Sequence, residues 1–181
     1  AKVYRDVVEL DNKSIITAIP MDWQSSAGGN YSCLIFDELH AWIYESNRRL
    51  FDELLPPPTK TNAVRWIASY AGYLGESELL KERWDRGLDG ELISENIPLY
   101  MNHNANLLAL IDTGPESWRM PWMTEKYINE IRESERPNTF ARLWMNEWVN
   151  SESAFVPIEA WNACLNKDIM PLAVGDNRKV T

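Results

Sequence analysis

The sequence predicts an α/β fold built on a parallel sheet, followed by a small helical annex. Short apolar runs alternate with amphipathic helical patterns as far as about residue 115. Those runs are almost unbroken by polar residues, which is typical of parallel strands covered on both faces. Beyond Asp112 the chain changes to a polar loop and further helical patterns. A chain of 181 residues is long enough to bury a substantial core without disulfides.

The predicted strands are short and bounded by turn residues. The first, residues 14–19, is rich in β-branched side chains and stops at Pro20. A loop of small residues that contains Gly28 and Gly29 follows it. The other predicted strands are 34–36, 64–69 and, with weaker signals, 93–100 and 107–111.

The predicted helices have recognisable boundaries. A run of three prolines ends the first, Gly87 ends the second, Thr124 caps the third, and Pro137 opens the fourth. Their ranges are 41–55, 76–86, 124–133 and a segment from 137 that carries Phe140, Leu143, Trp144 and Trp148 on roughly one face. We therefore expect a core over 1–115, a helical annex over 116–165 and a linker over 166–181.

Composition narrows the class of protein. The net charge of −9 argues against a protein that coats nucleic acid, although a motor can contact DNA through a few local positive groups. Cys33 and Cys164 have no metal-binding spacing and form no disulfide framework, so we expect a reducing compartment. No apolar stretch approaches the ~20 residues that cross a bilayer, and the N-terminus lacks a signal pattern. These features predict a cytoplasmic protein without a membrane partner.

Two adjacent carboxylates, Asp37 and Glu38, follow the apolar run of the second predicted strand. In open parallel sheets, ligands bind beyond the carboxyl ends of the strands, where this pair would lie. The pattern resembles the Walker B motif of P-loop ATPases with an additional catalytic glutamate. In that motif the Asp holds Mg²⁺, usually through water, and the Glu polarises the attacking water. The alternative is that the pair only opens the next helix, where acidic side chains suit the helix dipole.

Small and hydroxyl residues stand at the end of the next predicted core strand. This stretch, Ser69-Tyr70-Ala71-Gly72, resembles the coupling motif of helicases and packaging motors, in which a hydroxyl beside the γ-phosphate senses hydrolysis. The alternative is a tight strand-to-helix turn that requires glycine. The two strand ends together favour a nucleotide site more than either does alone.

The annex carries a family resemblance. The run RPNTF at 136–140, the run NEW at 146–148, Phe155-Val156-Pro157 and Ala160-Trp161 resemble the large terminase subunit of tailed double-stranded DNA phages, between its ATPase core and its nuclease domain. The resemblance spans nearly the whole chain. LIFDELHAW and SYAG fall where that family has its Walker B and coupling motifs.

The resemblance implies an incomplete RecA-like P-loop ATPase core that uses ATP and Mg²⁺. It implies that Glu38 is catalytic, that Asp37 is associated with Mg²⁺, and that Ser69, Tyr70, Ala71 and Gly72 form the coupling motif. It also implies double-stranded DNA, a portal protein and a small terminase subunit as partners, and a homo-oligomeric ring on the portal in the bacterial cytoplasm. Nuclease activity would belong to a further C-terminal domain.

The sequence departs from the family pattern in two places. The phosphate-binding loop, G-x-x-x-x-G-K-[ST], is not present, because Gly28 and Gly29 lack the following Lys. We therefore expect the chain to begin downstream of that loop. Asp176 stands among polar residues and is interpreted as part of a linker rather than as a nuclease acid. The identity of an arginine finger stays open, since Arg48 and Arg49 are interpreted as surface residues.

Two alternative functions remain open from the sequence. The first motor domain of a superfamily 2 helicase would also carry DELH followed by a small-residue motif. A non-catalytic interaction module could keep the sheet and bind protein through the Trp-rich annex. Of the other polar residues, His40 is interpreted as packing in the first turn of a helix, and His103 as a solvated loop residue.

Overall fold

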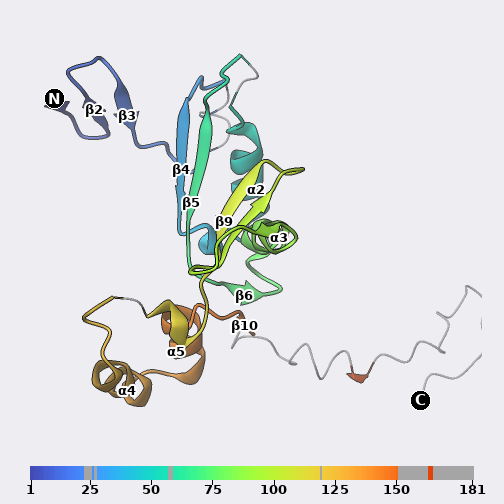
Figure 1. Cartoon of the computed structure of the whole chain (residues 1–181). Helices are drawn as coiled ribbons and strands as arrows, with labels where there is room; N and C mark the ends of the chain where they lie inside the picture. Colours follow the sequence, from blue (N-terminus) through green and yellow to red (C-terminus); the bar gives the residue numbers. More distant parts are fainter. Residues whose placement is uncertain (23–25, 27, 57–58, 119, 151–162, 165–181) are drawn as a thin grey trace, which may run out of the picture.

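The computed structural model describes residues 1–22, 26, 28–56, 59–118, 120–150 and 163–164, and these form a mixed α/β fold (Figure 1). The strands of this part belong to small sheets, some parallel and some antiparallel. Within these residues, none of the helices has the length and apolar character needed to span a bilayer. The predicted linker, residues 166–181, and Asp176 lie outside the described residues.

The centre of the molecule is a parallel pair of strands. Strands β4 (Cys33–Asp37) and β5 (Val64–Ala68) pair in register from Cys33↔Val64 to Asp37↔Ala68. Helix α2 (Glu45–Glu53) lies between them in sequence and against one face of the pair (Figure 1). A 3₁₀ turn, η1 (Leu39–Ala41), connects β4 to this helix. The strand–helix–strand unit is thus the parallel crossover that the sequence predicted, with the helix 41–55 shortened at both ends.

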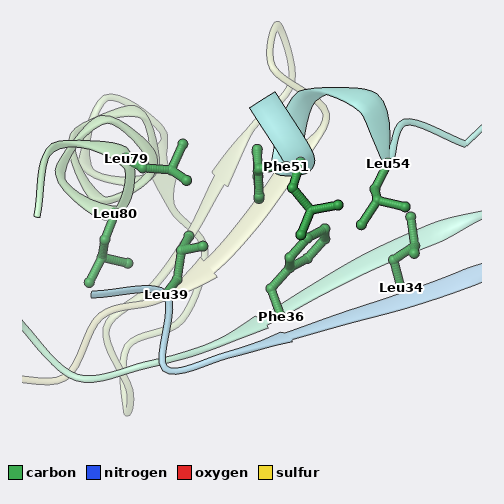
Figure 2. Close-up of a cluster of buried hydrophobic side chains, with 8 residues drawn as sticks. Leu34, Phe36, Leu39, Phe51, Leu54, Leu79 and Leu80 are labelled. Atoms are coloured by element: carbon green, nitrogen blue, oxygen red, sulfur yellow. The ribbon is translucent and has the colours of Figure 1, made fainter. Parts of the chain in front are cut away.

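The hydrophobic core fills the space between this pair and two helices. Leu34 and Phe36 point from β4 toward Leu54 and Phe51 beside α2 (Figure 2). The Phe36 and Phe51 ring centroids are 4.7 Å apart. Leu39 of η1, which is fully buried, connects this cluster to Leu79 and Leu80 of helix α3 (Glu78–Leu88). Alternate residues of β4 therefore hold both helices on one side of the sheet.

The prediction that the sheet is covered on both faces is wrong for the described residues. Ile35 is 70% exposed and Trp66 is 63% exposed, and the neighbouring Cys33 and Val64 are exposed as well. These four residues share the face of the pair that is opposite to α2. The apolar run of β4 predicts burial on both faces, but only the inward residues Leu34 and Phe36 are buried.

The predicted first strand, 14–19, also belongs elsewhere. Strand β3 (Ile15–Thr17) pairs antiparallel with β2 (Val7–Glu9), which pairs with β1 (Lys2–Val3). This three-stranded meander stands to one side of the central pair (Figure 1). Ile15 and Ile16 are exposed in it, so β-branched propensity here indicates an edge hairpin rather than a core strand.

A second meander covers α3. Strands β7 (Glu91–Leu92), β8 (Leu99–Asn102) and β9 (Leu107–Leu110) are antiparallel, whereas the sequence predicted further strands of a parallel sheet. Gly87 lies inside α3 and does not end it, contrary to the prediction. A Cβ at Gly87 would lie 2.8 Å from the Ala109 Cβ, so glycine here allows β9 to approach the helix closely.

The annex returns to the core at its end. Thr124 caps α4 (Glu125–Ser134) by accepting the Tyr127 N–H, and Pro137 opens α5 (Pro137–Trp144), as predicted. Trp148 lies beyond α5, contrary to the prediction, and packs edge-on against Trp84 of α3. Strand β10 (Val149–Asn150) then pairs parallel with β6 (Tyr73–Leu74). A further 3₁₀ turn, η2 (Pro115–Ser117), begins the annex.

We predict that Gly87→Ala lowers the free energy of unfolding by up to about 2 kcal/mol, because overpacking costs about 1–3 kcal/mol and helix propensity returns only about 1 kcal/mol. The new Cβ is fixed to the backbone and cannot turn away from Ala109. Urea unfolding measures the change. The exposed Arg86→Ala in the same helix is the control and should change stability by less than about 1 kcal/mol. A stabilised Gly87→Ala variant would contradict this packing.

Candidate carboxylate site at the ends of β4 and β5

The parallel pairing brings the two predicted site segments together. Asp37 lies opposite Ala68, and the Glu38 N–H donates to the Ala68 carbonyl at 2.8 Å. The chain then leaves β4 at Glu38 and leaves β5 at Ser69, on the same edge of the pair. All six residues singled out from the sequence, 37–38 and 69–72, therefore lie at adjacent strand ends.

Glu38 has an unusual backbone. Its φ of 52° and ψ of 46° are left-handed, a conformation that is uncommon for residues other than glycine and costs about 1–2 kcal/mol. Its side chain makes no capping hydrogen bond to η1, and α2 begins only after its own N-cap, Tyr44. Glu38 is the N-cap residue of η1 without a side-chain bond to it, so the pair opens a single 3₁₀ turn and not the α-helix that the sequence predicted. The carboxylate is 48% exposed, so water can reach it.

Asp37 and Glu38 are placed differently. Asp37 is the last residue of β4 and is exposed, on the face that also carries Cys33 and Ile35. The left-handed turn at Glu38 sends the next carboxylate toward the 69–72 loop instead. Two adjacent acids thus gain separate surroundings, as two different chemical roles would require.

His40 connects Glu38 to the loop. Its ring Nδ1 lies 3.1 Å from Glu38 Oε2 and 3.3 Å from Ser69 Oγ. Its backbone N–H donates to Ser69 Oγ at 3.2 Å. Its ring stacks on Tyr70 with centroids 4.6 Å apart. One ring nitrogen of His40 therefore lies close to both the Glu38 carboxylate and the Ser69 hydroxyl. The interpretation of His40 as a packed helix-start residue was therefore incomplete, since it also touches both halves of the site.

The 69–72 loop is tightly packed. Ala71 is fully buried, and a Cβ at Gly72 would lie 2.2 Å from Ser77 Oγ and 3.3 Å from the His40 Cβ. Ser77, which is 1% exposed, donates to the His40 carbonyl at 2.7 Å and accepts the Tyr73 N–H at 3.2 Å. Gly72 therefore makes the tight turn that was the alternative interpretation, and the same loop also packs against His40.

Sequence reasoning missed three residues that hold this loop: Ser77, Arg142 and Asn146. Asn146 Oδ1 accepts the Ala71 N–H at 2.7 Å, across 75 residues of sequence. The Arg142 guanidinium lies 5.0 Å from the Tyr70 ring centroid. The available signal for Asn146 was its position shortly after a helix, where a left-handed Asn is common.

The arginines weighed as candidate fingers are engaged elsewhere. Arg48 bonds both carboxylate oxygens of Glu82 at 2.7 and 2.8 Å, which ties α2 to α3. Arg49 pairs with Glu45 in its own helix at 3.2 Å. Both contacts agree with their interpretation as surface residues.

The donor set is compatible with Mg²⁺ held partly by water. Among the described residues, no group of three or more His, Cys, Asp or Glu side chains is arranged to hold a metal by itself. Mg²⁺ commonly uses one or two carboxylates, with water and phosphate oxygens completing its shell. The exposed carboxylate of Asp37 suits that arrangement.

A separate cleft of about 360 Å³ lies between the start of α2 and α3. Trp42 and Tyr44 line it together with the acids Glu45, Glu76 and Glu78 and one cation, Arg48, which is paired with Glu82. None of residues 37–38 and 69–72 lines it. The excess of carboxylates in the lining disfavours a triphosphate.

No protein family, curated protein or solved structure matches this chain. The terminase resemblance rests on the motifs quoted above, and the site on the geometry just described.

We predict that His40 titrates below 6.5, because burial and then the Arg142 charge lower its pKa more than Glu38 raises it. Glu38→Gln should lower the pKa of His40 further, since it removes the carboxylate. Ring-proton NMR titration measures both values, with His103→Gln to assign the two histidines. An unchanged or raised pKa in Glu38→Gln would contradict the contact.

The same lowered pKa has a consequence for stability. Between the folded-state pKa of His40 and 6.5, the unfolded chain binds more protons than the folded chain. The contribution of His40 to stability is therefore complete above pH 6.5 and is lost as the pH falls toward the folded-state pKa.

Proposed function

We propose that this chain is part of an ATP-hydrolysing motor that packages double-stranded DNA into phage procapsids. The proposal rests on the placement of Glu38 beside the 69–72 loop, at the ends of two parallel strands. The backbone of Glu38 is left-handed, and its side chain is 48% exposed. Such strained residues cluster at functional sites. A parallel β4–β5 pair with α2 between its strands agrees with a RecA-like P-loop core, which is the finer fold that we propose.

Glu38 is proposed to position the attacking water. Its exposed carboxylate can accept a hydrogen bond from water, and His40 Nδ1 lies 3.1 Å from its Oε2. A carboxylate there would align the water and accept its proton as the bond to the γ-phosphorus forms and the bond from that phosphorus to the β–γ bridging oxygen breaks, with ADP as the leaving group. Ser69 has its Oγ near His40 and donates to the Tyr70 carbonyl at 3.0 Å, so a change at the phosphate would reach the loop through this hydroxyl.

Asp37 is proposed to hold Mg²⁺ on the exposed side of β4, usually through water. When bound, the ion neutralises charge that develops on the phosphate oxygens. The sequence contains no G-x-x-x-x-G-K-[ST] loop. The proposal therefore requires that a segment outside this sequence supplies the phosphate-binding loop.

The packaging role is supported by the annex. The run from Arg136 to Trp148 that resembles terminases forms α5 and the segment that reaches the 69–72 loop. The partners follow from the same resemblance: double-stranded DNA, a portal protein, a small terminase subunit and further copies of the motor in a ring. Nuclease activity would reside in a further C-terminal domain.

We predict that Glu38→Gln, in a protein that joins this chain to a phosphate-binding loop, keeps ATP binding but slows hydrolysis by roughly a hundredfold or more. The amide keeps the shape but cannot take the proton. Phosphate release and calorimetry measure the two effects, and the exposed Glu53→Gln is the matched control. Wild-type turnover in Glu38→Gln would remove the catalytic assignment.

Asp37→Ala in the same protein should instead weaken Mg²⁺-dependent binding of ATP. An unchanged affinity for Mg·ATP would count against the metal role of Asp37.

We also predict that the 181-residue chain alone shows no measurable ATP hydrolysis and binds ATP only in the millimolar range, or about −4 kcal/mol. Phosphate binding in this class depends on backbone N–H groups and a lysine that this sequence lacks. Calorimetry with Mg·ATP tests this. Micromolar binding or steady turnover would mean that the phosphate site has been misplaced.

A further inference from the structure

Asn146 joins the annex directly to the 69–72 loop. Its Oδ1 accepts the N–H of the buried Ala71 at 2.7 Å, and its Nδ2 donates to the Asp112 carbonyl at 2.7 Å. Its backbone is left-handed, with a φ of 52°. One side-chain amide thus satisfies a buried backbone donor of the loop and ties it to the chain that enters the annex. Losing it would leave the Ala71 N–H unpaired in a buried place, which is costly.

Arg142 makes a second contact, one residue away along the loop. Its Cζ lies 5.0 Å from the Tyr70 ring centroid and 4.9 Å from that of Tyr73. Its Nε and Nη1 are buried and have no hydrogen-bond partner within the described residues. The guanidinium is therefore held mainly by the two ring faces, which attract a cation. A movement of α5 would move Arg142 and with it the Tyr70 ring.

The two contacts lead to Glu38 by short steps. Tyr70 stacks on His40 at 4.6 Å, and His40 Nδ1 lies 3.1 Å from the Glu38 carboxylate. Ala71 is next to Tyr70 in the same loop, and Ser69 before it accepts the His40 N–H. Every link in this route is a direct contact between described residues.

We propose that Arg142 and Asn146 are positioning residues of the carboxylate site, through which the annex sets the placement of the 69–72 loop and of Glu38. An effect of these two residues on ATP hydrolysis rests on the function proposed above. The physical coupling between the annex and the 69–72 loop does not. The competing interpretation is that the two residues only attach the annex. If the two residues only attach the annex, replacing them would speed amide exchange at Ala71 and leave exchange at His40 and Glu38 unchanged.

The chain offers matched variants. Asn146→Gly keeps the left-handed backbone and removes both side-chain hydrogen bonds. Asn106→Gly makes the same substitution at another left-handed residue, where φ is 48°, outside this route. Arg142→Met removes the cation from the tyrosine faces. Its control is Arg132→Met, which removes an Arg–ring contact of 5.0 Å to Phe140 inside the annex.

The first measurement is amide hydrogen exchange by NMR on the 181-residue chain without nucleotide. We expect Asn146→Gly to speed exchange about two- to tenfold at Ala71, the range that corresponds to one lost hydrogen bond. Exchange at His40, whose N–H bonds Ser69, should rise in the same variant and in Arg142→Met. Exchange at the core residue Phe51 reports the change in global stability, and the increases at Ala71 and His40 should exceed the increase at Phe51. In the two controls, exchange at Ala71 and His40 should change no more than exchange at Phe51.

Faster exchange confined to Ala71, or equal effects in the controls, would overturn the proposal. If Asn146→Gly does not fold, Arg142→Met and Arg142→Lys test the route alone. The His40 backbone N–H should then exchange faster in Arg142→Met than in Arg142→Lys, which keeps a cation between the tyrosine rings. Equal His40 exchange in the wild-type protein and both variants would contradict coupling through Arg142.

The second measurement concerns activity and uses the protein joined to a phosphate-binding loop. Asn146→Gly should lower kcat for ATP hydrolysis with little change in KM, because it disturbs the placement of Glu38 and not nucleotide binding. Normal kcat despite faster His40 exchange would overturn the catalytic part of the proposal. If the wild-type protein hydrolyses no ATP, the function proposed above fails, while the exchange result still decides the coupling.

Discussion

The arrangement depends on the parallel pairing of β4 with β5, and above all on its last rung, where the Glu38 N–H bonds the Ala68 carbonyl at 2.8 Å. A shift of one residue would turn Leu34 and Phe36 out of the core and bring Ile35 into it. The packing of Phe36 on Phe51 opposes such a shift, because burying each large apolar side chain contributes about 1.5–3 kcal/mol. The core therefore fixes the register, and the register fixes which residues meet at the strand ends.

Left-handed backbone occurs at both ends of the route from the carboxylate to the annex. Glu38 and Asn146 are left-handed, with φ values of 52° each. Such conformations persist only where surrounding contacts determine them. At Glu38 those contacts are the Ala68 carbonyl and the His40 ring, and at Asn146 they are the Ala71 N–H and the Asp112 carbonyl. Two left-handed turns that hold one loop between them are consistent with a site whose geometry depends on the annex.

Helix starts and strand positions, which depend on neighbouring residues in the sequence, could be predicted from local signals. Thr124 and Pro137 marked helix starts correctly, and the apolar run before Asp37 located the strand that presents the carboxylates. Contacts between distant segments left no comparable signal. The Asn146–Ala71 bond spans 75 residues. Gly87 allows the close approach of β9, but in the sequence alone a glycine at this position indicates a helix end. The strands 34–36 and 64–69 were expected to be covered on both faces because apolar runs do not reveal which side packs.

The most direct test of the central claim is to locate a bound metal–nucleotide complex. In a protein that joins this chain to a phosphate-binding loop, Mn²⁺ can replace Mg²⁺ and broaden the NMR signals of nearby amides. The account predicts that Mn·ATP broadens the amides of residues 36–40 and 68–72 before any others, and that Asp37→Ala removes this effect. Broadening centred on the acidic cleft around Glu76 and Glu78, with residues 36–40 sharp, would contradict it.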